Sequence, residues 1–303
     1  MANKWIEKFR QLLGIKQLRW DLMGKLDRLL IEQRRFQLWE HILHDTEPGI
    51  TSRRYADCDI VVSLTSFGPR LKDAAFAIES IMQQTVKANR IILWLSHDDY
   101  QQIPEALVLQ QKRGLEIKEC DDILSYKKLI PCLKECPNDA IVTIDDDLLY
   151  DCDILERLIM SYKETPQYIS ACRVHRIKYL EDGTMAPYNN WYWTISEVGP
   201  NPANFFTTGA GTLFPPDSLD KEVLNQEAFM SICKYADDIW LNAMAMKKGT
   251  LVTKVRTRST TGEDYIINGW MQSSSLGQKN VVEKRNDDQI KAVWGKYNLP
   301  KML

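Results

Sequence analysis

From about residue 58 onward, short apolar runs alternate with longer segments in which apolar residues recur every three or four positions. The short runs are typical of buried strands, and the periodic segments predict helices. Their alternation predicts an α/β domain with a mainly parallel sheet and helices on both faces. The expected strands are 59–66, 90–96, 115–120 and 140–145, and the expected helices are 71–85, 103–114, 125–137 and 153–164.

The pattern becomes mixed after about residue 168. Residues 169–177 and 249–257 predict strands, and residues 235–249 and 287–299 predict helices. Residues 259–280 contain many Gly, Ser, Thr and Asn residues and show no periodicity. A loop of this length in a compact domain is usually a functional lid or a disordered segment, and we expect one of the two here.

Residues 1–45 precede this domain and carry apolar residues at near-helical spacing, which predicts one or two helices. Basic residues outnumber acidic ones there, and a basic amphipathic helix can lie on an anionic membrane surface. Acidic residues such as Asp21 and Asp27 interrupt the basic face, which favours packing on the protein's own domain or on a partner subunit. We therefore expect a helical extension over residues 1–50, which contacts a membrane surface or forms a dimer, and an α/β domain over residues 51–303.

Composition and charge exclude several classes of protein. The chain has 303 residues and a formal net charge of −2, so no global basic field points to nucleic acid. No apolar window long enough for a spanning helix occurs, and the N-terminus lacks the uninterrupted apolar core of a secretory signal. The seven cysteines show no metal-ligand spacing and predict reduced thiols. We expect a cytoplasmic protein that does not bind nucleic acid.

Three adjacent carboxylates, Asp145, Asp146 and Asp147, follow the apolar run IVTI at the end of an expected strand. Alternate side chains of an extended chain point the same way, so Asp145 and Asp147 can converge while Asp146 points elsewhere. Two converging carboxylates suit Mg²⁺ or Mn²⁺, which completes its coordination with water and substrate phosphate oxygens. The alternative is a solvated turn in which aspartates favour the start of the following helix. Because ligands of such sheets bind at this edge, the metal site is favoured.

The sequence resembles the GT-A glycosyltransferases, in which a hydrophobic strand ends in Asp-x-Asp after an N-terminal nucleotide-binding region. Further blocks are similar to bacterial family-2-like glycosyltransferases that build surface polysaccharides. The likeness covers about residues 58–300. It implies a GT-A fold, which is Rossmann-like with a mainly parallel mixed sheet flanked by helices, here after an N-terminal helical extension. The blocks are VSLTSFGPRL, SYKKLIPCLKECPNDAIVTIDDDLLY, TGAGTLFPP and YADDIWLNAMAMKKG.

The resemblance implies that the first block surrounds the nucleotide base and phosphates of a donor, and that lysines before the Asp triplet approach the same donor. Asp145 would lie near the ribose or the water shell of the metal, Asp147 would bind the metal directly, and Asp146 would face the sugar or a basic partner. The metal and basic side chains would stabilise the leaving nucleoside diphosphate. The alternatives are a solvated helix face for the lysines and an ion pair with Asp73 for Arg70. The implied donor-binding residues are Thr65, Ser66, Phe67, Arg70, Lys127, Lys128, Asp145 and Asp146, and the implied metal ligands are Asp145 and Asp147.

A second acidic pair, Asp237 and Asp238, begins an expected helix. In inverting GT-A enzymes a carboxylate at this place takes a proton from the acceptor hydroxyl, so the resemblance implies Asp238 as the general base and Asp237 as the second choice. The alternative is that Asp237 caps the helix. An aspartate base suits inversion, but similar Asp blocks occur in retaining GT-A enzymes, so the stereochemistry stays open.

Other features give weaker signals. Gly209 and Gly211 indicate either a close approach of the backbone or a tight turn. The aromatic residues 191–193 can stack on a sugar ring or fill the core. His175 either faces the site or has a structural role. No histidine follows it, which leaves a third metal ligand to water or to the 259–280 segment.

Together these observations predict a metal-dependent glycosyltransferase with Mn²⁺ or Mg²⁺ as its cofactor. The donor is a nucleotide sugar, with UDP-sugars favoured, and the acceptor is a glycan or a lipid-linked molecule. The expected location is the cytoplasm, including the inner membrane face. A phosphatase of the haloacid-dehalogenase type also uses Asp-x-Asp after a strand, but Leu149 stands where those enzymes have Thr or Val. A non-catalytic nucleotide-sugar-binding protein is the second alternative, and it needs neither a base at Asp238 nor a lid.

Overall fold

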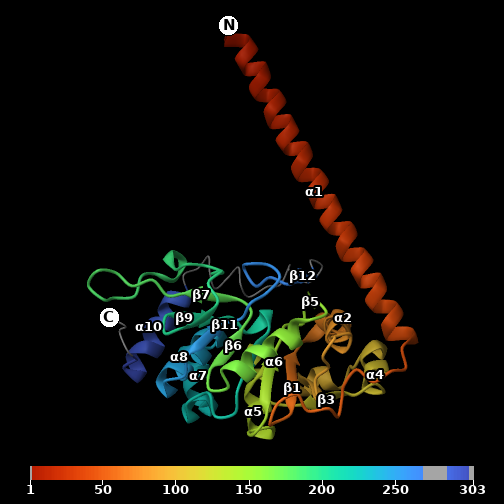
Figure 1. Ribbon diagram of the computed structural model, residues 1–303, viewed down its shortest axis with the longest axis vertical. Helices are drawn as coiled ribbons and strands as arrows, with labels where there is room; N and C mark the ends of the chain where they lie inside the picture. The colour runs from red at the N-terminus through yellow and green to blue at the C-terminus, as the bar shows by residue number, and fades with distance from the viewer. Residues whose placement is uncertain (1, 269–284, 300–303) are drawn as a thin grey trace.

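The computed structural model describes residues 2–268 and 285–299, and its centre is an eight-stranded sheet (Figure 1). The strand order is β3-β2-β1-β4-β10-β6-β11-β8. Strands β1 to β4 are parallel, as are β6 and β11, whereas β10 and β8 run antiparallel to their neighbours. The expected α/β architecture, a mainly parallel mixed sheet flanked by helices after an N-terminal helix, is confirmed. The strands are β1 (Ile60–Thr65), β2 (Arg90–Leu95), β3 (Leu115–Glu119), β4 (Ala140–Thr143), β6 (Ile169–Ala171), β8 (Gly199–Asn201), β10 (Thr212–Phe214) and β11 (Val252–Lys254).

Strand β1 shows how the core is divided between the two faces of the sheet. Val61 belongs to one buried cluster, while Ile60 and Val62 belong to the other, because alternate residues of a strand point to opposite faces. Helices α1, α2, α4 and α6 contribute to the second cluster, and α5, α7, α8 and α10 contribute to the first. The helices of the domain are α2 (Leu71–Met82), α3 (His97–Tyr100), α4 (Glu105–Gln111), α5 (Ile130–Glu135), α6 (Ile154–Glu164), α7 (Gln226–Ile232), α8 (Asp237–Lys248) and α10 (Arg285–Tyr297).

The single helix expected over residues 125–137 is wrong, since the segment forms a 3₁₀ turn, η2 (Leu124–Lys128), and then α5. Pro131 lies in the first turn of α5. The first turn of a helix needs no N–H donor at this position, but a proline prevents a helix that precedes it from continuing. The two adjacent lysines of η2 have different partners, Asp122 for Lys127 and Asp145 for Lys128. The remaining 3₁₀ turns are η1 (Gly68–Arg70), η3 (Tyr188–Asn190), η4 (Thr208–Ala210) and η5 (Lys221–Leu224).

Two other expectations are corrected. The strand expected over residues 169–177 is broken after β6, and its second part, β7 (Val174–Arg176), pairs with β9 (Asn204–Phe206). Within the segment expected to lack regular structure, β12 (Tyr265–Ile267) pairs with β5 (Leu148–Tyr150) directly after the Asp triplet. The rest of that segment, residues 269–280, lies outside the described residues.

The N-terminal segment forms one helix, α1 (Ala2–His44), of 43 residues. Its last turns pack on the domain through Leu38 and Ile42, which are buried. The part before them projects away from the domain (Figure 1), and large apolar side chains such as Leu22 and Leu29 are exposed. Among the described helices, none combines the length and the apolar character needed to cross a membrane.

Candidate functional site

The sequence-predicted acidic residues meet where the carboxyl ends of β1 and β4 lie beside the start of α8. Ligands of open α/β sheets bind at this edge. Lys128 of η2 links the two acidic pairs, because its Nζ lies 2.5 Å from Asp145 Oδ1 and 3.5 Å from Asp237 Oδ2. The structure therefore brings the Asp triplet and the Asp237–Asp238 pair into one site.

The triplet itself does not lie on a strand. Strand β4 ends at Thr143, and Asp146 and Asp147 form a turn that leads into β5. The strand alternation assumed from the sequence therefore does not apply to these side chains. Their directions are set by basic partners from other parts of the chain, with Lys128 beside Asp145 and Arg70 beside Asp146.

Asp146 is the buried anchor of the triplet, with 5% of the residue exposed. It accepts hydrogen bonds from Ser66 Oγ at 2.6 Å and from Arg70 Nε at 3.0 Å, and Arg70 Nη2 forms a further ion pair with it. Two of the expected donor-binding residues, Ser66 and Arg70, thus hold the loop after β1 against the loop after β4. Arg70 pairs with Asp146 and not with Asp73, whose partner is Arg35.

Asp147 has 18% of its side chain exposed, and its Oδ2 lies 3.1 Å from Arg70 Nη2. Burial and the nearby charges of Asp145 and Asp146 raise the pKa of Asp147 to about 6. Arg70, which is shared with Asp146, therefore compensates the charge of Asp147 only in part.

Asp145 contacts two parts of the chain. Besides its ion pair with Lys128, its carboxylate lies directly against the backbone of η4, because a Cβ added to Gly209 would be 1.8 Å from Asp145 Oδ2. Its backbone N–H donates to Tyr150 Oη at 2.8 Å, and Tyr150 donates to the Gly209 carbonyl at 2.5 Å. The close backbone approach suggested by Gly209 is therefore observed, and the group approached is the Asp145 carboxylate.

Lys128 is almost fully buried among these acids, with 8% of its side chain exposed. Burial alone would lower the pKa of Lys128, but Asp145, Asp237 and Asp238 together raise it above its usual value. Lys128 is therefore a permanent cation. Its neighbour Lys127 instead pairs with Asp122 at 2.6 Å, at the end of β3.

The acids at the start of α8 do not cap the helix. Ala236 is the N-cap residue and makes no side-chain cap, while Asp237 accepts from Ser125 Oγ at 2.8 Å. Asp238 Oδ1 accepts from both the N–H and the Oγ1 of Thr208, at 2.9 and 2.8 Å. Burial and the neighbouring Asp237 raise the pKa of Asp238 to about 6. One oxygen of Asp238 is thus fixed by Thr208, and no hydrogen bond to the other is found among the described residues.

The remaining expected donor-binding residues lie towards β2 and β3. Thr65 Oγ1 donates to the Trp94 carbonyl at 2.8 Å, so it holds β1 against β2. Phe67 is 47% exposed, and the guanidinium of Arg70 lies 5.4 Å from its ring centre. Beyond this loop a cavity of about 510 Å³ opens at the carboxyl ends of β2 and β3. Its lining residues are Ser96, His97, Asp98, Glu119, Cys120, Asp121 and Asp122.

Arg173 is a residue of the site that the sequence did not single out. Its Nε donates to Thr207 Oγ1 and its Nη1 to Tyr265 Oη, both at 2.8 Å. Burial lowers the pKa of Arg173, but Tyr265, Asp238 and Asp145 outweigh it and raise the pKa. The only sequence signal was the alternation of Arg173 with His175, which directed attention to the histidine instead.

His175 has a structural role. Its Nδ1 accepts from the N–H of Thr194 at 2.9 Å, and its ring packs 4.7 Å from the ring of Trp193. Burial and the charge of Arg173 lower the pKa of His175 to about 3, so the ring is neutral. Of the neighbouring aromatic residues, Trp191 is 5% exposed and belongs to the core, whereas Tyr192 and Trp193 are 56% and 42% exposed.

The acidic residues suit a divalent ion that is held together with a ligand. Within residues 2–268 and 285–299, no three His, Cys, Asp or Glu side chains are arranged to hold a metal by themselves. Lys128 pairs with Asp145 and lowers its pKa, whereas Arg70 is shared between Asp146 and Asp147 and the pKa of Asp147 is raised. Mg²⁺ is often held by one carboxylate together with substrate phosphates. The site therefore fits an ion shared between Asp147 and a phosphorylated ligand.

Comparison with known proteins gives little beyond this geometry. No family model matches the chain, and no curated protein matches it. Among solved structures, the chain is similar to residues 1–349 of S. aureus TarS in complex with UDP, with 12% sequence identity and a TM-score of 0.42. The similarity covers 65% of this chain and 59% of the TarS chain. The chain thus spans less than two thirds of that structure, and no functional conclusion is drawn from a likeness of this size.

Proposed function

We propose that the chain is a glycosyltransferase that moves a sugar from a nucleotide-sugar donor, with UDP-sugars favoured, to a hydroxyl of a glycan or lipid-linked acceptor. Residues 51–303 would form the GT-A domain and residues 1–50 an extension. The observation that carries the proposal is the Lys128 bridge between Asp145 and Asp237. Through it, the Asp triplet that would serve the donor phosphates and the pair of candidate base carboxylates lie at one edge of the sheet.

The donor would lie across the carboxyl ends of β1, β2 and β3. The cavity of about 510 Å³ at β2 and β3 is large enough for a base and a ribose, and Phe67 offers an exposed aromatic face beside it. The diphosphate would then extend towards Arg70 and Asp147. Because a leaving nucleoside diphosphate gathers negative charge, Arg70 and Arg173 are placed to stabilise it.

Asp147 would hold Mn²⁺ or Mg²⁺ together with phosphate oxygens of the donor, with Asp145 as the second candidate ligand. When bound, such an ion supplies positive charge to the departing diphosphate. The raised pKa of Asp147 supports this assignment, because it reports negative charge that the side chains of the chain leave uncompensated. Asp146, held by Ser66 and Arg70, would keep the loop in place.

Asp238 would act as the general base. Thr208 fixes one of its oxygens, which orients the other towards the site, and a base must lie within hydrogen-bond reach of the proton that it removes. A pKa of about 6 leaves Asp238 ionised at neutral pH while making it a stronger base than an ordinary carboxylate. Asp237 is the less suitable candidate, because Ser125 and Lys128 already occupy it.

The N-terminal helix would join two copies of the chain. Its exposed apolar residues Leu22, Leu29, Phe36 and Leu43 recur at intervals of seven, which is the spacing of a coiled-coil seam. Contact with the inner membrane face is the alternative role for this helix, in a protein of bacterial surface polysaccharide synthesis.

The test is a screen of UDP-, GDP- and TDP-sugars with Mn²⁺ and oligosaccharide acceptors, with release of the nucleoside diphosphate as the readout. Acceptor-dependent release supports the proposal. Phosphate release from simple phosphomonoesters without nucleotide release would point to a phosphatase. Nucleotide binding that never leads to turnover with any acceptor would point to a binding protein.

A further inference from the structure

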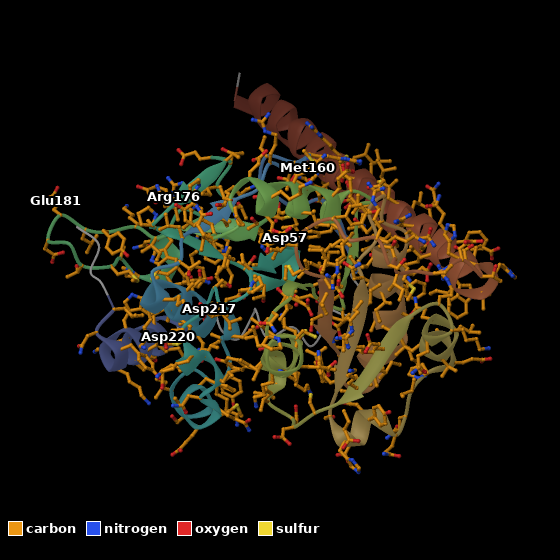
Figure 2. The ribbon with its side chains drawn as sticks, turned by 60° about the horizontal axis from the view of Figure 1, so that its bottom comes forward. Asp57, Met160, Arg176, Glu181, Asp217 and Asp220 are labelled. Carbon is orange, nitrogen blue, oxygen red and sulfur yellow. The ribbon has the colours of Figure 1, made fainter. Side chains whose placement is uncertain are left out.

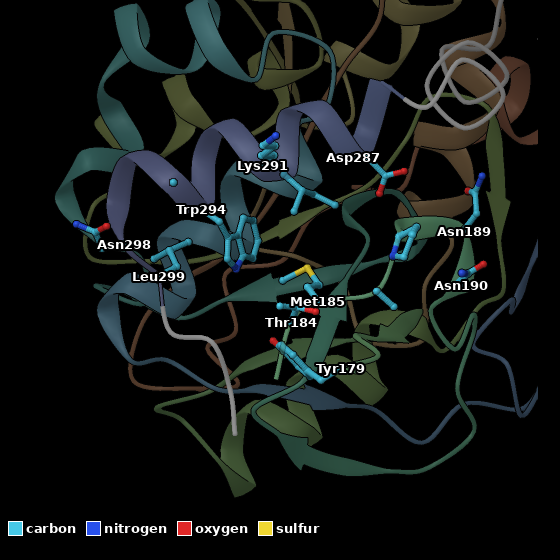
Figure 3. Close-up of a pocket in the computed structure, with 14 residues that line it drawn as sticks. Tyr179, Thr184, Met185, Asn189, Asn190, Asp287, Lys291, Trp294, Asn298 and Leu299 are labelled. Carbon is cyan, nitrogen blue, oxygen red and sulfur yellow. The ribbon is translucent and has the colours of Figure 1, made fainter. Parts of the chain in front are cut away.

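A second cavity, of about 930 Å³, opens between α10 and the segment that precedes η3 (Figure 3). Its wall is a hairpin over residues 178–186, in which the Ala186 N–H bonds the Lys178 carbonyl and the Leu180 N–H bonds the Thr184 carbonyl, both at 2.8 Å. Glu181 lies at the exposed tip of this hairpin (Figure 2). The cavity is therefore bounded by a hydrogen-bonded hairpin on one side and by a helix on the other.

Two aromatic residues in the walls carry polar atoms that lack partners. Tyr179 Oη and Trp294 Nε1 are buried, and neither has a hydrogen-bond partner in the part of the chain that the structure describes. Figure 3 shows Tyr179 on the hairpin side and Trp294 on the α10 side, with Met185 between them. A buried polar group without a hydrogen-bond partner destabilises the folded state. A ligand with hydroxyl groups would remove this cost when the rings turn towards it.

Gly295 is the third unusual feature of the cavity. It lies inside α10, where glycine is less favourable than alanine, and its φ is not positive. A Cβ added there would meet no atom within 4 Å. Neither the backbone nor the packing thus requires glycine at this exposed position on the edge of the cavity.

We propose that this cavity binds a sugar ring of the acceptor, as a carbohydrate subsite separate from the place of transfer; this rests on the proposed function. Trp294 and Tyr179 can offer aromatic faces to the C–H side of a pyranose, and the amides of Asn190 and Asn298 line the same cavity. Its charged residues, Asp287 and Lys291, are of opposite sign. This balance of charge favours a neutral ligand over a nucleotide. An alkyl chain would leave Tyr179 Oη and Trp294 Nε1 without hydrogen-bond partners.

Tyr188 connects the cavity with the transfer site. Its backbone N–H donates to Asp287 Oδ1 at 2.7 Å, so η3 is attached to α10. Its phenol is buried near Asp238, whose charge contributes to raising the pKa of Tyr188. Helix α10 also packs against α8, which carries Asp238. An acceptor of several sugars can therefore present one hydroxyl to Asp238 while an earlier ring occupies the cavity on the other side of η3.

Saturation-transfer NMR on the full chain tests the proposal, with oligosaccharides of glucose, galactose, mannose and N-acetylglucosamine as probes and decanoate as an alkyl probe. Gly295→Leu adds an apolar side chain at the edge of the cavity, where a Cβ meets no atom within 4 Å. Gly24→Leu is the matched control, since a Cβ at Gly24 in α1 also meets nothing within 4 Å. We expect at least one oligosaccharide to bind the wild type and Gly24→Leu, and Gly295→Leu to bind it about tenfold or more weakly.

Equal oligosaccharide binding by Gly295→Leu, binding of decanoate alone, or binding of no sugar by the wild type overturns the subsite. Parallel titrations with UDP, GDP and TDP keep this result separate from the proposed function. Binding of a nucleotide without binding of a sugar removes only the cavity proposal. If Gly295→Leu abolishes sugar binding but the wild type binds none of the three nucleotides, the cavity proposal stands and the glycosyltransferase proposal fails.

Discussion

Lys128 Nζ, at the end of η2, and Asp145 Oδ1, in the turn after β4, lie 2.5 Å apart. The pair is asymmetric in its exposure, since 8% of the Lys128 side chain and 33% of the Asp145 side chain are accessible. Lys128 is the only one of the two adjacent lysines that touches the acidic cluster. It therefore holds together a set of carboxylates that would otherwise repel one another.

We expect Lys128→Met to destabilise the protein by about 3 kcal/mol, because removal of one partner leaves buried carboxylates uncompensated. The measurement is urea unfolding at neutral pH. Lys127→Met is the matched control, since Lys127 is equally buried but its partner Asp122 is 60% exposed and can be solvated. Equal losses in the two variants would contradict a special role for Lys128.

Asp147→Asn is expected to abolish the part of UDP affinity that depends on Mn²⁺ and to leave metal-free UDP binding unchanged. The reason is that Asp147 is the carboxylate whose charge the side chains of the chain compensate least. Calorimetric titration with UDP, with and without Mn²⁺, measures both quantities. Asp122→Asn serves as a control at an acid outside the triplet. Unchanged Mn²⁺-dependent affinity in Asp147→Asn would remove Asp147 as the metal ligand.

The same substitution should stabilise the folded protein at neutral pH. The pKa of Asp147 in the folded chain, about 6, lies above its usual value of 3.8, so ionisation of Asp147 opposes folding. The protonated Asp147 carboxyl contributes its full stability below about pH 4, and this contribution is lost as the pH rises through 6. Asp147→Asn should therefore raise the free energy of unfolding at pH 7 by about 1–3 kcal/mol, and the gain should vanish near pH 4. Thermal unfolding across this range measures it, and a gain that is independent of pH would contradict the assignment.

The fold was predictable because its signals are local. The apolar runs that became β1, β2, β3 and β4 identify themselves within a few residues, and helices such as α8 repeat their pattern over several turns. The place of the site followed from the sheet, since the carboxyl ends of parallel strands share one edge. Both inferences need only the order of the elements.

The pairing within the site was not predictable, because it joins residues far apart in sequence. Ser66 and Arg70 belong to one loop, and only the folded chain shows that both contact Asp146. The strand alternation assigned to the triplet failed because β4 ends before the first aspartate. The choice between Lys127 and Lys128 depended on their partners, Asp122 and Asp145, which lie in different loops.

The exposed apolar residues of α1 predict that the chain is a dimer through this helix. Leu22 and Leu29 lie on the side of the helix opposite to the buried Leu38 and Ile42, and both are more than half exposed, at 58% and 61%. The double variant Leu22→Glu and Leu29→Glu should be a monomer by light scattering, because charges directly in a seam oppose association. Trp20→Glu should stay dimeric.

Trp20 is the control for this prediction because it is 75% exposed but lies outside the seven-residue repeat. A wild-type chain that is monomeric at all concentrations contradicts the dimer. If such a chain instead floats with anionic vesicles, and the double variant does not, the apolar residues contact a membrane surface.

Asp238→Asn should retain UDP binding and lose transfer by about 10²–10⁴-fold, which is the usual contribution of a positioned general base. Thr208 can still donate to the amide oxygen, so the geometry is preserved while proton removal is lost.

The pH profile of transfer gives an independent check on Asp238. Because burial and Asp237 place the pKa of Asp238 at about 6, kcat/KM of the wild type should fall as the pH decreases below 6 and be flat above about 7. Asp237→Asn should shift this limb to lower pH, since it removes a neighbouring negative charge that raises the pKa of Asp238. A limb that stays in place in Asp237→Asn, or transfer that persists in Asp238→Asn, would assign the base to another residue.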